Sequence, residues 1–257
     1  MYINKIIQTS ADAGKIVLEN GGETYRVEDT MQKICEAYGI TSSNSFVTPT
    51  GIMLSATDEQ GHAFALIRRI KNRTTNLEKL ARVNYLARSI KSNHLSIDEF
   101  DDKLKQINLT PHYSELTHLI CGSFSAASCT IIFGGNYFDA SISMIAGGAI
   151  KAMSIFLTRF NFNNFFINLI GGAIASTIAL FAVKYGFAIH TDKIIIGAVM
   201  LLVPGIAITN AIRDTISGDL IAGSARAVEA FFIAVAIAVG VGFILKLWFI
   251  YFGIKVL

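Results

Sequence analysis

The amino-acid sequence predicts an α-helical polytopic membrane protein with about five transmembrane helices, preceded by a small cytosolic α/β domain. Of the 257 residues, 52% are hydrophobic and only 16% are charged, whereas a soluble domain is typically about 25% charged. The charges are unevenly distributed, because residues 1–115 carry 28 charged side chains and residues 116–257 carry 13. We therefore expect a water-soluble domain over residues 1–115 and a transmembrane domain over residues 116–257.

Charge and cysteine content exclude several classes of protein. Residues 1–115 have no net charge, so the formal net charge of +3 comes from the apolar part. A positive excess there reflects membrane topology, and no nucleic-acid partner is expected. The three cysteines form no CxxC pair, and neither they nor the five histidines have the spacing of metal ligands. We expect no metal and no cofactor.

The first 115 residues have the periodicity of a mixed α/β domain. Gly21-Gly22 and Gly39 are expected to end the first two helices, and Ser96-x-x-Glu99 is a capping box that starts the fourth. The predicted helices are Asn4–Asn20, Val27–Tyr38, Asn76–Lys91 and Ser96–Gln106, and the predicted strands are Ser45–Thr48, Gly51–Thr57 and His62–Ile70. The pattern leaves the order of the strands open.

Residues 116–257 contain five apolar runs separated by short polar breaks. A membrane-spanning helix needs about 20 mostly apolar residues, and each run approaches that length. The predicted spans are Leu116–Gly134, Phe138–Leu157, Phe165–Tyr185, Ile194–Ile212 and Val228–Phe252. Arginines concentrate on the side of the N-terminal domain, so the positive-inside rule predicts a cytoplasmic N-terminus and an outside C-terminus. No signal peptide is expected, because the first long apolar run begins near Leu116.

The densest polar cluster of the soluble part consists of Glu23, Arg26, Glu28 and Asp29. Carboxylates beside an arginine could act as acid and base or bind a polar ligand. The simpler interpretation is a helix N-terminus, where acidic residues complement the helix dipole and Arg26 pairs with one of them. A basic stretch from Arg68 to Arg88 could likewise bind an anion or the anionic inner leaflet, or be a solvated face.

The fourth apolar run contains Pro204 and Gly205 at its middle. Proline removes a backbone donor and glycine loosens the turn, so we expect this span to be kinked or broken there. A broken span can build an ion or substrate site where its freed backbone faces protein or water. A kink that serves only packing is the alternative.

Five polar residues follow this break at short intervals, and ionisable groups at this depth are costly and suggest a function. They are Asn210, Arg213, Asp214, Asp219 and Arg226. We predict that they line a cytoplasm-facing cavity, in which an arginine holds a substrate carboxylate and an aspartate exchanges protons. Internal Arg–Asp salt bridges in a cytoplasmic loop are the alternative, and the sequence favours neither.

Four motifs, in order along nearly the whole chain, resemble those of a known family. They are Gly14–Met31 with its Gly21-Gly22-Glu23 and Arg26-Val27-Glu28-Asp29 cores, Thr48-Pro49-Thr50-Gly51-Ile52, the segment Asn76–Arg88, and Pro204-Gly205 through Arg226. They resemble the threonine/serine exporter (ThrE-like) family, although Gly22 stands where that family often has alanine. The length and the plan of a soluble domain followed by five spans most resemble the YjjP branch.

The resemblance implies a subunit of an inner-membrane exporter for a small carboxylate metabolite, driven by the membrane potential or the proton gradient. Threonine or serine is the substrate in one branch and a succinate-like dicarboxylate in the other. The YjjP branch splits the exporter between two chains, so a hetero-oligomer with a YjjB-like membrane subunit is implied. Two rival functions stay open: a membrane-bound hydrolase that uses the Glu23–Asp29 cluster, and a regulatory or assembly subunit of a permease.

Overall fold

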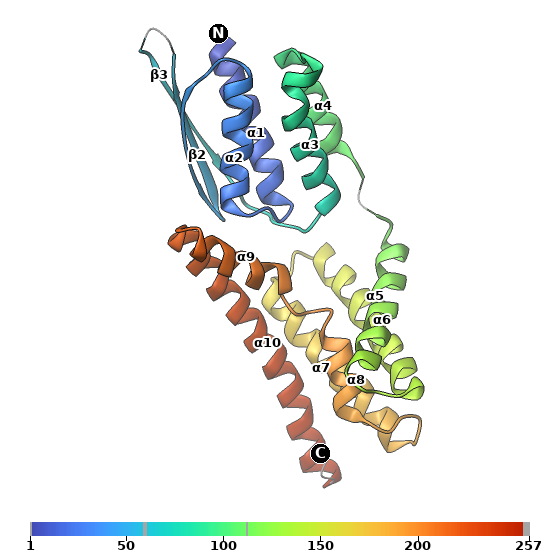
Figure 1. Cartoon of the computed structure of the whole chain (residues 1–257). Coiled ribbons are helices and arrows are strands. Elements are labelled where there is room, and N and C mark those ends of the chain that lie inside the picture. Colours follow the sequence, from blue (N-terminus) through green and yellow to red (C-terminus); the bar gives the residue numbers. More distant parts are fainter. Residues whose placement is uncertain (1, 59–60, 112, 254–257) are drawn as a thin grey trace. The chain divides into compact units, whose positions relative to one another are not determined.

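The computed structural model describes residues 2–58, 61–111 and 113–253 (Figure 1). They form two compact units, each described here by itself. The first unit contains the described residues as far as Pro111 together with Gly205–Val228, and the second contains the remainder. The domain boundary at residue 115 stays a prediction, and the first unit includes a segment that the sequence analysis assigned to the transmembrane part.

The N-terminal part of the first unit has helices and strands within three residues of the predicted bounds. They are α1 (Tyr2–Glu19), α2 (Thr24–Ala37), β1 (Ser42–Thr48), β2 (Gly51–Thr57), β3 (Ala63–Arg69), α3 (Leu77–Asn93) and α4 (Ile97–Leu109). The predicted capping box is present at the start of α4. The Glu99 N–H donates to the Ser96 hydroxyl at 3.3 Å, and the Ser96 N–H donates to the Glu99 carboxylate at 2.9 Å.

The three strands form an antiparallel sheet in the order β1-β2-β3, which the sequence pattern had left open. One face of the sheet is apolar, since Val47, Ile52, Leu54 and Ala56 are buried. α1 packs against β2 and β3, and α2 packs against β1. α3 and α4 lie on the other side of α1, so that α1 and α2 form the middle layer of this part (Figure 1).

α2 is held firmly against α1, which fixes the position of its N-terminus. A Cβ atom built on Gly14 of α1 would lie 2.6 Å from the Met31 sulfur, so a larger residue there would force the Met31 side chain to move. Beside it, the Ser10 hydroxyl donates to the Met31 carbonyl at 2.9 Å. Val17, Val27 and Met31 are all buried in the same core.

Four helices of the described chain are long and apolar enough to cross a membrane. They are α5 (Glu115–Ile132), α6 (Tyr137–Arg159), α7 (Asn164–Lys184) and α10 (Leu220–Phe252), and they correspond to four of the five predicted runs. α10 begins in the first unit and continues through the second. The chain is therefore mostly helical with four candidate spans among the described residues.

The remaining predicted span, Ile194–Ile212, is divided into two short helices at the expected place. α8 (Thr191–Val199) ends before residues 200–204, and α9 (Gly205–Ile216) begins directly after Pro204. Proline has no N–H and disfavours helical geometry in the preceding residue, which accounts for the break. Neither helix alone is long enough to span a bilayer, so the count of five spans is not confirmed.

Small residues allow the helices of the second unit to approach closely. α8 packs against α5, α6 and α7. A Cβ atom on Gly147 of α6 would lie 2.6 Å from the Ala126 methyl group on α5. Gly240 of α10 leaves no room for a side chain against the carbonyl oxygen of Leu169 on α7. Such contacts are typical of helices that associate in membranes.

Candidate functional site

The polar residues after the helix break lie on a helical hairpin formed by α9 and the start of α10. The turn between them contains Gly218 with φ +93°, a conformation that glycine adopts readily. The Asp219 N–H donates to the Asp214 carbonyl at 2.9 Å and closes the turn. The hairpin thereby brings Arg226 of α10 against Asp214 of α9, with 3.0 Å between the Arg226 Nε and the Asp214 carboxylate.

Asp214 connects this hairpin to the N-terminus of α2. Its carboxylate accepts hydrogen bonds from the Thr24 N–H at 3.2 Å and from the Thr24 hydroxyl at 2.8 Å. Glu23, at the N-cap position of α2, makes no capping hydrogen bond of its own. Asp214 therefore supplies the anionic cap that the start of this helix favours. The side chain of Asp214 is 0% exposed and that of Arg226 is 6% exposed, so their ion pair is buried.

The glycine turn before α2 supplies two further acceptors. The Arg226 guanidinium donates to the Gly22 carbonyl at 2.9 Å, and the Asn210 amide donates to the Gly21 carbonyl at 3.0 Å. Gly21 has φ +97°, and a Cβ atom on Gly22 would lie 2.8 Å from the Val17 carbonyl oxygen. The positive φ favours glycine at position 21, the close approach to Val17 favours it at position 22, and the carbonyls of both residues accept hydrogen bonds from the hairpin.

Glu23 is shared by two arginines. Its carboxylate forms ion pairs with Arg213 of α9 and, at 3.0 Å, with Arg26 of α2. The Glu23 side chain is only 9% exposed, whereas that of Arg213 is 49% exposed. A buried carboxylate between two guanidinium groups is an arrangement that recognises carboxylates, and both arginine side chains are partly accessible to solvent, that of Arg213 more than that of Arg26.

Asp219 completes the contacts around Thr24. Its carboxylate accepts from the Thr24 hydroxyl at 2.9 Å, and the same hydroxyl also faces Asp214. A hydroxyl carries one proton, so it can serve only one of the two carboxylates at a time. Burial, together with the charges of Asp219 and Asp214, raises the pKa of nearby Glu28, whose carboxylate accepts the Val47 N–H at 3.1 Å. This end of α2 therefore carries an excess of carboxylates.

The structure brings together the five residues predicted after the break, but the five differ in burial and in hydrogen bonding. Asn210, Asp214 and Arg226 are buried and hydrogen-bonded, whereas Arg213 is exposed and Asp219 is partly exposed. The Asp214–Arg226 ion pair is the internal salt bridge that the sequence analysis gave as the alternative.

The N-terminal candidates lie on three faces of α2. Glu23 faces the hairpin, Glu28 faces β1, and Arg26 and Asp29 line a pocket toward α3. Sequence reasoning missed Thr24 altogether, because its two carboxylate partners are 190 and 195 residues away and no local pattern marks it.

A further buried carboxylate lies in the second unit. Asp139 at the start of α6 accepts from the backbone N–H groups of Asn136, Ile189 and His190 at 2.9–3.1 Å. The His190 ring nitrogen lies 2.8 Å from the same carboxylate. Asp139 thereby ties the start of α6 to the connection between α7 and α8.

With this geometry established, comparison with known proteins identifies the family. A family model described as "Putative threonine/serine exporter" matches residues 8–248. The chain belongs to the threonine/serine exporter family. The resemblance inferred from the four sequence motifs is thereby confirmed, and the apolar helices α5, α6, α7 and α10 are those of a membrane protein of this exporter family.

Relatives within the threonine/serine exporter family fall into two lengths. The chain is 24% identical to the "Threonine/serine exporter" of Corynebacterium glutamicum and to the "Probable threonine/serine exporter" of Mycobacterium tuberculosis, over 92% and 94% of its length. It spans only about half of those proteins, 50% and 46% respectively. It is also 24% identical to the "Probable succinate transporter subunit YjjP" of Escherichia coli, covering 91% of both chains. No solved structure gives a significant match.

Proposed function

We propose that the chain is a subunit of an inner-membrane exporter that carries a small carboxylate metabolite out of the cell. Membership of an exporter family supports transport, and the relatives' names supply two substrate classes, threonine or serine and succinate. Both classes present at least one carboxylate, which is the feature that an arginine recognises through paired hydrogen bonds.

The observation that carries the substrate site is the Glu23 carboxylate held by two arginines, one of which is half exposed. We propose that a substrate carboxylate exchanges with Glu23 on the guanidinium of Arg213. Asp219, partly exposed on the same hairpin, is the group that exchanges a proton. Asn210, Asp214 and Arg226 hold the hairpin on the N-terminus of α2 during this exchange.

For the topology, we propose a cytoplasmic N-terminus and an outside C-terminus, in agreement with the positive-inside rule. Five crossings result if α8, the break at Pro204 and Gly205, and the first turn of α9 act as one discontinuous span. Broken spans are tolerated where the freed backbone faces protein or water, which is also where transporters bind their substrates.

The driving force depends on the charge of the substrate. A dianion that leaves a negative-inside cell gains about 2.3 kcal/mol per charge per 100 mV. A zwitterionic amino acid gains nothing from the membrane potential, so its export needs proton entry or a concentration gradient. We therefore propose that dicarboxylate export responds to the potential and that threonine export responds to the proton gradient.

For the assembly, we propose a hetero-oligomer with a smaller YjjB-like membrane subunit. The word "subunit" in the names of the relatives of matching length supports a partner chain. Glycine-lined helix contacts such as that at Gly240 show that the spans of this chain are suited to close helix association.

The test is uptake of labelled succinate, threonine and serine by inverted vesicles that contain this chain with and without the partner. Arg213→Ala should abolish uptake in well-inserted protein, and Arg213→Lys should impair it because lysine lacks the planar fork. Arg82→Ala is the matched control, because it also removes an exposed arginine that pairs with a glutamate, Glu78 on α3.

Each outcome of this assay has a defined meaning. Normal uptake by Arg213→Ala would exclude the proposed substrate site. Full transport by the purified chain alone would exclude the hetero-oligomer, and full transport by the partner alone would make this chain a regulatory subunit. Failure of all three acids in vesicles that contain both chains would refute export of small carboxylates.

A further inference from the structure

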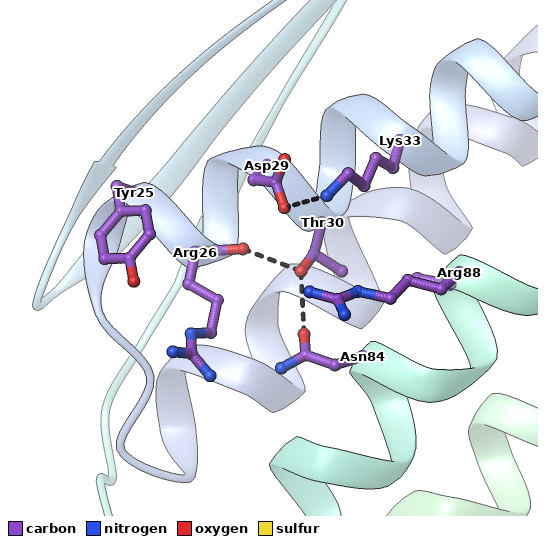
Figure 2. A pocket seen from close by; sticks show the side chains of 8 residues that line it. Tyr25, Arg26, Asp29, Thr30, Lys33, Asn84 and Arg88 are labelled. Atoms are coloured by element: carbon purple, nitrogen blue, oxygen red, sulfur yellow. Dashed lines mark hydrogen bonds and ion pairs between the residues drawn. The ribbon is translucent and has the colours of Figure 1, made fainter.

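A pocket of about 130 Å³ lies between α2 and α3, on the face of α2 that points away from β1. Figure 2 shows its lining side chains, with Arg26, Asp29, Thr30 and Lys33 on α2 and Asn84 and Arg88 on α3. Tyr25 and Ala87 complete the lining. Of these residues only Arg26 also touches the proposed substrate site, through its ion pair with Glu23.

The ionic contacts inside the pocket leave an excess of positive charge. Lys33 and Asp29 neutralise each other through an ion pair of 2.6 Å. Arg26 is paired with Glu23 outside the lining, and the Arg88 side chain makes no hydrogen bond or ion pair with the described residues. Arg88 reaches from α3 toward Thr30 (Figure 2), so its guanidinium is presented to the pocket.

The hydrogen bonds of the pocket leave donors without acceptors. The Thr30 hydroxyl donates to the Arg26 carbonyl at 2.8 Å and lies 3.1 Å from the Asn84 side-chain oxygen. The one Thr30 proton serves only one of these two acceptors at a time. The Asn84 NH₂ group makes no hydrogen bond with the described residues, so it can donate to a ligand. The one carboxylate in the lining, Asp29, is already satisfied by Lys33. Only a ligand rich in acceptors complements such a set.

We propose that this pocket is a second anion site, which binds a small dianionic oxyanion, a dicarboxylate or phosphate, through Arg88, Asn84 and Arg26. The charge excess disfavours cations, and the spare donors disfavour apolar ligands. The volume is close to the ~150 Å³ of an engineered cavity that accommodates benzene. Ligands of about five to eight non-hydrogen atoms therefore match it in size.

Arg26 connects this pocket to Glu23, and through Glu23 to Arg213. An anion in the pocket competes with Glu23 for Arg26, so Glu23→Gln should free Arg26 and tighten anion binding several-fold. Any consequence for transport rests on the function proposed above, whereas binding to the pocket does not.

The experiment is calorimetric titration of the full chain in detergent with succinate, with inorganic phosphate, and with uncharged succinamide. We expect succinate or phosphate to bind and succinamide not to bind. Arg88→Ala should weaken binding by about tenfold to a hundredfold, the effect of losing charge-assisted hydrogen bonds. Lys91→Ala, an exposed cation on the same helix outside the pocket, is the matched control and should leave affinity unchanged.

The same titrations distinguish between the two anions and between the two proposed sites. Whichever of succinate and phosphate binds more tightly identifies the class of ligand. Arg213→Ala leaves Glu23 to Arg26 alone and should weaken this pocket only a few-fold, so loss of transport in that variant with retained binding separates the two proposals. Should neither anion bind, or should both bind Arg88→Ala as tightly as the unaltered chain, the proposal is wrong. Arg88 is exposed, and Arg88→Lys, expected to have intermediate affinity, repeats the test if the alanine variant is poorly folded.

Discussion

Removing the Asp214 carboxylate should destabilise the first unit far more than removing an exposed carboxylate. Asp214→Ala removes the buried carboxylate that faces Arg226, and loss of one partner of a buried ion pair costs about 3–5 kcal/mol. It also removes the cap on the Thr24 N–H, a contribution of about 1 kcal/mol. We expect a loss near the upper end of the range for the ion pair.

The structure provides both a control and a way to apportion the loss. Asp12→Ala breaks an exposed pair with Arg68 at 2.8 Å, and such pairs contribute at most about 1 kcal/mol. Arg226→Met retains the apolar stem of the side chain and removes its charge. Because the two buried residues contact each other, Asp214→Ala with Arg226→Met should cost less than the sum of the single changes.

The assay is hydrogen–deuterium exchange of the full chain in detergent, read at the amides of α2. Asp214→Ala should accelerate exchange near Thr24, whereas Asp12→Ala should leave it close to that of the unaltered chain. If Asp214→Ala behaves like Asp12→Ala, and if the effects of the Asp214 and Arg226 changes simply add, the buried pair does not hold the hairpin on α2.

Three further predictions concern other parts of the chain. Burial and two nearby aspartates raise the pKa of Glu28, so its contribution to stability is present at low pH and is lost as the pH rises through the folded-state pKa. Glu28→Gln keeps the acceptor for the Val47 N–H and should raise the melting temperature at neutral pH more than at pH 4; an unchanged difference would contradict this. Gly240→Val should prevent α10 from packing at the Leu169 carbonyl and lower the yield of folded protein in detergent, and normal yield would show that α7 and α10 separate freely. A cysteine at exposed Ser217 should be labelled by an impermeant thiol reagent only in inverted vesicles, and labelling in intact cells would reverse the proposed topology.

Local patterns were sufficient to predict the elements of this chain. The helix stop at Gly21-Gly22, the capping box at Ser96 and the break at Pro204 each depend on neighbouring residues, and each is present in the structure. The run Ile194–Ile212 was predicted as one span with a break at Pro204, and the break is present. Hydropathy averaged over the run does not tell whether two helices that are each too short to span a bilayer act together as one crossing, so the count of five spans stays a prediction.

The sequence predicted two separate sets of candidate residues, but it did not predict that the two sets are in contact. Glu23 and Arg213 were both selected as candidates, yet nothing in the sequence relates them, because their contact joins positions 190 residues apart. The role of Thr24 depends on the same long-range packing. Asp214 and Arg226 were predicted to line a cavity or, as the alternative, to form an internal salt bridge. In the structure the two are buried against each other, Asp214 accepts from the Thr24 N–H, and Arg226 donates to the Gly22 carbonyl.

Glu23 pairs with both Arg213 and Arg26, so it determines whether binding at one proposed anion site strengthens or weakens binding at the other. A substrate carboxylate on Arg213 displaces Glu23, which is buried and must then rely on Arg26. When an anion in the α2–α3 pocket binds Arg26 at the same time, the displaced Glu23 has no cation left to pair with. Binding at one site therefore weakens binding at the other. Coupling between sites is reciprocal, so substrate should weaken anion binding by the same factor. Phosphate or succinate at the pocket should therefore raise the substrate concentration needed for half-maximal uptake, and Glu23→Gln should abolish this dependence. An anion that lowers the required substrate concentration would show that Glu23 does not link the two sites.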